Sequence, residues 1–116
     1  MEKFVDNYAS ANCEILYKLF LRMHINFTKD IADCLYTGIS TDTGCFRYTN
    51  TTAETMRVAA SLMDFGCNTA YINKAMFETK SKNKIQLERA VYESMTYCAD
   101  CRCAIIYTSL DMLKKL

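Results

Sequence analysis

The stretch Thr-Asp-Thr-Gly-Cys-Phe-Arg-Tyr-Thr-Asn-Thr-Thr, residues 41–52, is the main part of the densest polar segment of the chain, residues 37–52. Asp42 lies at the predicted end of a helix, where a carboxylate can bind a hard cation such as Mg²⁺ or Mn²⁺. Arg47 follows closely, and an arginine can hold a phosphate by a bidentate contact. Spacing alone favours a simpler structural interpretation, in which Asp42 forms an Asx-turn with the Gly44 amide and Thr51 caps a helix.

Helical periodicity precedes this segment. Apolar residues at helical spacing predict a helix over residues 11–24 with Ser10 as its N-cap. A second helix should begin after Thr28 and end near Asp42. Gly38 lies inside it, and a mid-helix glycine costs about 1 kcal/mol relative to alanine. A close contact with a neighbouring element should therefore require Gly38.

Helical signals also follow the segment. The spacing Thr51-x-x-Glu54 matches a capping box and predicts a third helix, which Gly66 should end. Further periodic runs predict a short helix over about residues 69–77 and a longer one over about 81–97. The chain has no proline and only three glycines, which indicates a mostly helical fold.

The C-terminal part changes pattern. Residues 103–107 form a short apolar run with β-branched and aromatic side chains, which predicts a strand. Ser109 or Thr108 should cap a last segment, residues 110–116. Because a single strand needs hydrogen-bond partners, we expect these partners to lie outside this chain or in another copy of it.

Composition limits the function. The net charge of +1 gives no electrostatic footprint for duplex nucleic acid or an anionic membrane, although a short nucleotide needs only a few contacts. No apolar run approaches the roughly 20 residues that span a bilayer, and the start lacks a signal-peptide layout, so we expect a cytoplasmic protein. Seven cysteines, an odd number without an export signal, indicate reduced thiols. The triplet Cys98, Cys101 and Cys103 lacks a fourth zinc ligand nearby.

Residues 35–52 resemble the fourth conserved motif of the DHH-family phosphoesterases, and most of all its bacterial oligoribonuclease and pAp-phosphatase branch, the nanoRNases. Residues 9–17 are similar to the helix that follows the Asp-His-His motif of that branch. Residues 62–66 and 77–81, with the long helix, resemble its linker. Residues 104–107 resemble the first strand of its substrate-binding (DHHA1) domain. The resemblance thus covers nearly the whole chain.

The resemblance implies a mainly α fold within an α/β architecture. Residues 1–78 would be the C-terminal part of a DHH domain, residues 79–102 a linker helix, and residues 103–116 the start of a DHHA1-type domain. It also implies a two-metal phosphoesterase that uses Mn²⁺ or Mg²⁺ and hydrolyses short oligoribonucleotides, 3′-phosphoadenosine 5′-phosphate (pAp), or both.

Asp42 matches the metal-ligand aspartate of this motif, whereas Arg47, Asn50 and Thr52 match positions that support the loop or contact phosphate. The chain lacks most of the other motifs of the family. The early Asp-x-Asp, the middle Asp, the Asp-His-His and the Gly-Gly-Gly-His motifs are absent, and the single histidine, His24, has no neighbouring histidine. A metal needs several ligands and Asp42 is one, so we expect the isolated chain not to catalyse.

Three functions remain open. The first is a piece of a nanoRNase, whose partners would be short RNA or a nucleotide and a second copy, with no membrane or duplex DNA. The second is a non-catalytic helical interaction module, because apolar faces left exposed favour dimerisation or aggregation. The third is a piece of an exopolyphosphatase-like or cyclic-dinucleotide phosphodiesterase. The string of residues 46–52 favours the first.

Overall fold

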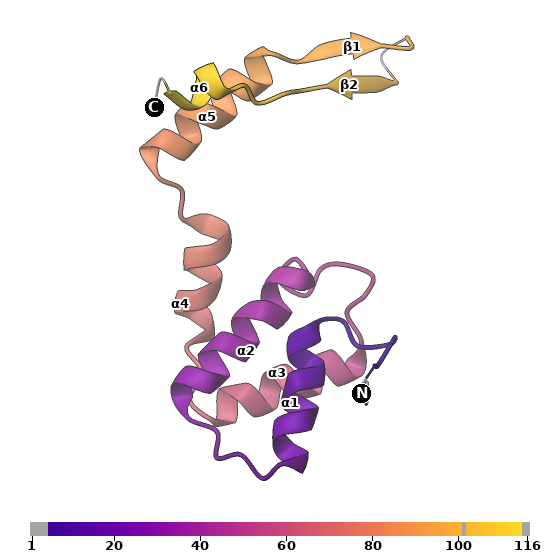
Figure 1. Ribbon diagram of the computed structural model, residues 1–116, viewed down its shortest axis with the longest axis vertical. Coiled ribbons are helices and arrows are strands. Elements are labelled where there is room, and N and C mark those ends of the chain that lie inside the picture. The colour runs from indigo at the N-terminus through magenta and orange to yellow at the C-terminus, as the bar shows by residue number, and fades with distance from the viewer. Residues whose placement is uncertain (1–4, 101, 115–116) are drawn as a thin grey trace. The chain divides into compact units, whose positions relative to one another are not determined.

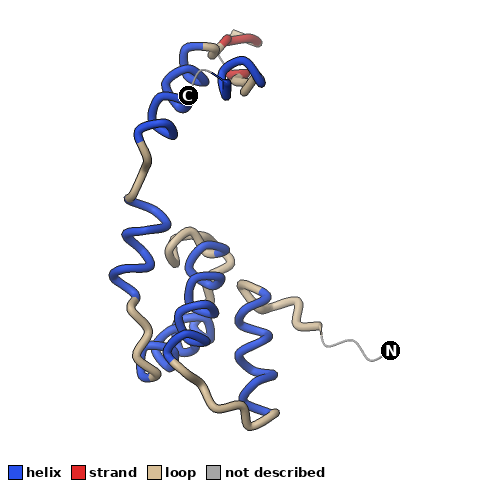
Figure 2. Tube along the Cα trace, turned by 60° about the vertical axis from the view of Figure 1, so that its left-hand side comes forward, coloured by secondary structure: helices blue, strands red, loops and turns tan. Residues whose placement is uncertain are grey.

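The computed structural model describes residues 5–100 and 102–114, which fall into two compact units, Met1–Glu78 and Thr79–Leu116 (Figure 1). The first unit is helical, and the second holds a helix, a hairpin and a short terminal helix; helices are blue and strands red in Figure 2. No helix in the described ranges is both long and apolar enough to cross a membrane. The fold class is confirmed: helices dominate, with one small two-stranded sheet.

The first unit is organised around α2. Its elements are α1 (Asn12–Arg22), α2 (Lys29–Asp42), α3 (Ala53–Asp64), α4 (Thr69–Asn73) and the π-helical turn η1 (Lys74–Glu78). Helix α2 packs against α1, α3 and α4, and α1 also touches α3 (Figure 1). The core lies between these helices, and Ile39 of α2 and Leu62 of α3 are fully buried in it. Burying such a side chain stabilises the fold by about 1.5–3 kcal/mol.

Helix α2 begins and ends as its sequence predicts. The Thr28 hydroxyl accepts a hydrogen bond from the Ile31 amide, so Thr28 is the N-cap. The close contact expected at Gly38 is confirmed, because a Cβ there would lie 2.2 Å from the Cys13 Sγ atom of α1. The glycine therefore allows α1 and α2 to approach each other.

The predicted N-cap of the first helix is wrong. Ala11 occupies the cap position of α1 and makes no side-chain capping bond. Ser10 instead directs both its amide and its hydroxyl to the buried Glu14 carboxylate. The Ser10 hydroxyl thus binds the buried Glu14 carboxylate and does not cap the helix. Leaving that buried charge without hydrogen bonds would cost far more free energy than leaving the helix end uncapped.

The predicted capping box of the third helix is wrong by one residue. Thr52 is the N-cap of α3, and its reciprocal partner is Thr55. Glu54, the expected partner, points to the surface and pairs with Arg57 at 3.0 Å. Thr55 can complete the capping box with Thr52 because its hydroxyl both donates and accepts hydrogen bonds. The helix ends as predicted, before Gly66 with φ of 87°.

The short helix expected over residues 69–77 is present as α4 followed by η1. Asn68 caps α4 by accepting a hydrogen bond from the Tyr71 amide. The change to π-helical hydrogen bonding at Lys74 was not predicted, because a 3.6-residue period does not distinguish the two helix types over so short a run.

The second unit contains α5 (Lys82–Glu93), β1 (Thr96–Cys98), β2 (Cys103–Ile105) and α6 (Leu110–Lys114). Ser81 caps α5, and the Ser109 hydroxyl accepts from the Met112 amide at the start of α6. Helix α5 ends at Glu93, four residues before the predicted limit of 97. Of the remaining residues of that run, Ser94 is the C-cap of α5, and Thr96 and Tyr97 belong to the strand β1.

The expectation that the strand at 103–107 finds its partners outside the chain is wrong. Strands β1 and β2 pair as an antiparallel hairpin, with Thr96 opposite Ile105 and Cys98 opposite Cys103. Ala99 and Asp100 have φ of 51° and 53°, and this left-handed backbone turns the chain between the strands. The run Thr-Tyr-Cys has the β-branched and aromatic composition of a strand, but it continues the helical period of α5, which concealed it.

The described cysteines are free thiols, as the composition predicted: Cys13, Cys34, Cys45, Cys67, Cys98 and Cys103. Cys101, the middle member of the C-terminal triplet, lies outside the described residues.

Candidate functional site

Asp42 is the last residue of α2 and is exposed to solvent. Within the described residues its carboxylate makes no hydrogen bond and no ion pair. The Asx-turn that spacing favoured is not formed, because the Gly44 amide donates to the Thr41 carbonyl at 3.2 Å. The Asp42 carboxylate is therefore available to a ligand.

The backbone after Asp42 turns in an unusual way. Gly44, Cys45 and Phe46 have φ of 56°, 59° and 63°, and only the first of the three is a glycine. A left-handed conformation costs about 1–3 kcal/mol for a residue with a side chain. An added Cβ at Gly44 would lie 2.3 Å from the Tyr48 ring, but this ring is the exposed end of a side chain that can move aside, so the positive φ is the reason for a glycine here.

Thr43 stabilises this left-handed turn through hydrogen bonds of its hydroxyl and its carbonyl. Its buried hydroxyl donates to the Ile39 carbonyl at 2.7 Å and accepts from the Phe46 amide at 3.0 Å. Its carbonyl accepts from the Arg47 and Tyr48 amides at 2.9 and 3.0 Å. The sequence analysis missed Thr43, and the only local signal for it was its place inside the motif.

Arg47 extends from this turn into solvent. Its Nε donates to the Gly44 carbonyl at 2.7 Å, which fixes the start of the guanidinium group. Its two terminal nitrogens make no hydrogen bond to any described residue. Arg47 thus supports the turn and also presents donors to a ligand.

Asn50 joins two distant parts of the chain. Its Nδ2 donates to the Ser10 carbonyl at 3.0 Å and to the Asp42 carbonyl at 3.2 Å. Thr52, two residues later, caps α3. Asn50 and Thr52 are therefore both structural, and Asn50 places Asp42 next to the segment that leads into α1.

A buried carboxylate completes this arrangement. Glu14 is 1% exposed. Its Oε2 accepts from the Ser10 amide and hydroxyl and from the Thr55 hydroxyl at 3.0–3.2 Å, and its Oε1 accepts from the Lys18 ammonium group at 3.0 Å. Burial raises the pKa of Glu14, but the bonds from Lys18, Ser10 and Thr55 outweigh it and hold the pKa below its ordinary value. Glu14 thus ties the starts of α1 and α3 together as an anion.

The described residues do not form a metal site by themselves. They contain no group of three or more His, Cys, Asp or Glu side chains placed to hold one ion. Asp42 offers a single carboxylate, whereas Mg²⁺ and Mn²⁺ require several oxygen ligands. The arrangement presents one exposed carboxylate at the end of α2, with an arginine five residues away in the sequence.

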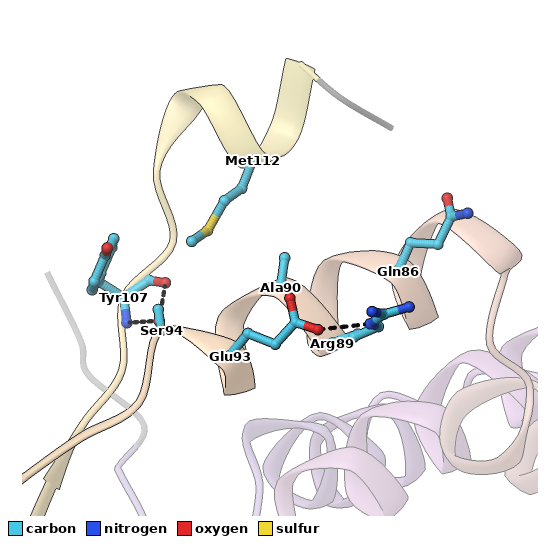
Figure 3. Close-up of a pocket in the computed structure, with 7 residues that line it drawn as sticks. All are labelled: Gln86, Arg89, Ala90, Glu93, Ser94, Tyr107 and Met112. Atoms are coloured by element: carbon cyan, nitrogen blue, oxygen red, sulfur yellow. Dashed lines mark hydrogen bonds and ion pairs between the residues drawn. The ribbon is translucent and has the colours of Figure 1, made fainter.

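A pocket lies within the Thr79–Leu116 unit, away from the Asp42 turn in the sequence (Figure 3). Residues of α5, the segment after β2, and α6 line it: Gln86, Arg89, Ala90, Glu93, Ser94, Tyr107 and Met112. Its two charges neutralise each other, since Arg89 Nε lies 2.8 Å from Glu93 Oε1. The Ser94 hydroxyl bonds the Tyr107 backbone at 3.4 Å and joins the end of α5 to the exit of β2. These contacts account for the polar lining by structure alone.

No protein-family model matches the chain. The chain is 41% identical over 66 residues to the bifunctional oligoribonuclease and PAP phosphatase NrnA of Thermus thermophilus, covering 57% of this chain and 20% of that protein. It is 28% identical over 115 residues to the protein of the same name from Bacillus subtilis, covering 97% and 36%. The crystal structure of an exopolyphosphatase-related protein from Bacteroides fragilis matches 93% of this chain and 32% of its own, with a TM-score of 0.79 and 27% identity.

The chain is related to the DHH-family phosphoesterases of the nanoRNase type. The resemblance inferred from residues 35–52 is thereby confirmed. The chain spans between about a fifth and about a third of the length of these relatives. The activity of these whole proteins is therefore only a proposal for this chain.

Proposed function

We propose that this chain forms part of a metal-dependent phosphoesterase that hydrolyses short oligoribonucleotides, pAp, or both, and that Asp42 is one of its metal ligands. The observation that carries the proposal is the exposed Asp42 carboxylate at the end of helix α2. The names of the relatives, oligoribonuclease and PAP phosphatase, support the substrate class.

The bridge made by Asn50 supports the placement of Asp42. It binds the carbonyls of Asp42 and Ser10 with one amide group. Residues 9–17 resemble the helix that follows the Asp-His-His motif of the family, and residues 1–9 do not contain that motif, so in a longer protein it would lie before residue 1. The other ligands of the ion, expected to be Mn²⁺ or Mg²⁺, would then come from that preceding segment, and the bridge from Asn50 to Ser10 would hold Asp42 beside the chain that leads from it.

The isolated chain should not catalyse. One carboxylate does not hold a catalytic ion, so we expect no turnover when the purified 116-residue chain is incubated with pAp and Mn²⁺. Robust release of phosphate that disappears on chelation would contradict this expectation.

A graft tests the substrate class. Residues 1–116 replace the corresponding segment of the Bacillus subtilis relative, which aligns over 115 residues. We expect the graft to hydrolyse pAp and a short oligoribonucleotide, and to act poorly on tripolyphosphate. A graft that prefers tripolyphosphate would instead support an exopolyphosphatase-like function, to which the structural neighbour from Bacteroides fragilis points.

One observation favours the non-catalytic interaction module. An apolar groove between α1 and α2 is lined by Leu16, Phe20, Ile31 and Leu35, with Cys13, Cys34 and Asp30 beside them. Sedimentation of the purified chain separates the candidates: a defined complex with a second copy, together with an inactive graft, would favour the module.

A further inference from the structure

Two rare backbone conformations of the Met1–Glu78 unit meet at one pocket. The left-handed turn at residues 44–46 forms one wall and the π-helix η1 forms the other. The lining residues are Cys45, Arg47, Asn73, Phe77 and Glu78. Strained residues and π-helical turns concentrate at functional sites, because a fold keeps such costs only where the geometry is needed.

The wall formed by α4 is rigid. Asn73 accepts a hydrogen bond from the Ser40 hydroxyl at 2.9 Å and donates to the Tyr36 hydroxyl at 3.1 Å. Its amide is therefore engaged on both sides and positions the π-helix against α2. The lining groups left for a ligand are the guanidinium of Arg47, the ring of Phe77 and the carboxylate of Glu78.

These three groups differ in chemistry. Arg47 and Glu78 are both exposed at the pocket, and the hydrogen bond that anchors Arg47 uses its Nε, not its terminal nitrogens. The Phe77 ring is half-exposed and stacks on no other ring there. The backbone amides of the left-handed turn are already bonded, so they do not bind an anion. Any anion in this pocket would therefore be held by Arg47.

We propose that this pocket binds one nucleotide, with its phosphate on Arg47, its base on the Phe77 ring, and Glu78 accepting from a ribose hydroxyl or an exocyclic amine. The pocket volume of about 300 Å³ suits a ligand of this size. Arginine binds phosphate in a bidentate manner, and aromatic rings stack bases without sequence preference.

The opposite charges of Arg47 and Glu78 limit the class of ligand that fits the pocket. A nucleotide carries an anion at one end and hydrogen-bond donors at the other, which matches Arg47 and Glu78. A polyphosphate is anionic throughout, so Glu78 would repel it. The proposal deepens the proposed function, on which its choice of substrate class rests, and it assigns nucleotide recognition to Phe77 and Glu78.

Binding of AMP to the 116-residue chain in the presence of EDTA tests this subsite. We expect saturable binding at millimolar AMP, weakened about fivefold or more by Phe77→Leu, whereas binding of ribose 5-phosphate, which lacks a base, stays unchanged. Arg47→Met should weaken both ligands. Glu78→Gln should raise the affinity for tripolyphosphate.

Met76→Leu is the matched control, because Met76 lies on the same π-helix and does not line the pocket. The proposal is overturned if AMP shows no saturable binding, if Phe77→Leu affects AMP and ribose 5-phosphate equally, or if Met76→Leu reproduces its effect. Thermal melts of each variant identify unfolding, and a variant that fails to fold is replaced by Phe77→Met. EDTA removes metals, so AMP binding in its presence does not depend on the metal site. If the chain binds AMP but the graft is inactive, only the proposed function is contradicted. If the graft is active but the chain does not bind AMP, only the nucleotide subsite is contradicted.

Discussion

Glu14 is the residue on which the site region depends most. Its buried carboxylate accepts hydrogen bonds from the Ser10 amide and hydroxyl, the Thr55 hydroxyl of α3 and the Lys18 ammonium group of α1. The substitution Glu14→Gln keeps the shape of the side chain but places an amide where four donors point. We expect the free energy of unfolding in urea to fall by about 1–3 kcal/mol, because donors at a buried site lose their acceptor. Glu54→Gln, in the exposed pair with Arg57, is the control and should change it by less than about 0.5 kcal/mol.

The charge of Glu14 also predicts a pH dependence. Its pKa is held below its ordinary value of 4.5, so its stabilising effect is fully present above that pH and is lost as pH falls through the lowered pKa. We expect urea midpoints to decrease below about pH 4.5 and the slope to diminish in Glu14→Gln. An equal slope in both proteins would show that Glu14 does not carry the effect.

Cys67 gives a prediction of reactivity. Burial and the neighbouring Asp33 carboxylate raise its pKa to about 12, which suppresses the nucleophilic thiolate. Alkylation of the native chain with iodoacetamide at neutral pH, followed by mass spectrometry, should label Cys67 much more slowly than the exposed Cys98. Faster labelling of Cys67 would contradict this assignment of its environment.

At the scale of elements, the contact between α1 and α2 depends on Gly38. Alanine would favour the helix by up to about 1 kcal/mol, but its Cβ would lie 2.2 Å from Cys13 Sγ. Overpacking costs about 1–3 kcal/mol, so we expect Gly38→Ala to lower stability by about 1 kcal/mol. Adding Cys13→Ala should restore most of the loss in chemical denaturation. A Gly38→Ala chain more stable than the parent would show that α1 moves away without cost.

Local signals in the sequence predicted the helices better than their boundaries. Thr28 and Gly66 act as expected because their roles involve only adjacent backbone. Ser10 and Thr51 were wrongly assigned because tertiary contacts decided those positions: Ser10 serves Glu14, and Thr55 both completes the cap at Thr52 and bonds Glu14. The strand β1 was missed because three residues continued a helical period.

For the candidate site, the sequence predicted the residues but not the contacts that support them. The motif located Asp42 and its neighbours Arg47 and Asn50, but it did not show how they are supported. The bridge from Asn50 to Ser10 spans 40 residues and the bond from Thr55 to Glu14 spans 41. Pairings at such separations leave no periodic signal in one sequence, so the support of the site becomes visible only in the structure.

At the scale of the whole molecule, the two units differ in how they are stabilised. The Met1–Glu78 unit has a continuous buried core between its helices. In the Thr79–Leu116 unit none of the described residues is buried, and Tyr97, Ile105 and Leu110 are largely exposed. A two-stranded hairpin is marginally stable by itself in water. We therefore expect hydrogen exchange to protect amides of α2 and α3 strongly and those of β1 and β2 weakly.

The central claim is that Asp42 is a metal ligand in a longer phosphoesterase. The most direct test is the Mn²⁺ content of the graft into the Bacillus subtilis relative, measured by elemental analysis after dialysis. Asp64→Asn, at the exposed end of α3, is the control for Asp42→Asn at the end of α2. We predict that Asp42→Asn loses bound Mn²⁺ and hydrolysis together, whereas Asp64→Asn keeps both. Full Mn²⁺ content and activity in Asp42→Asn would contradict the claim.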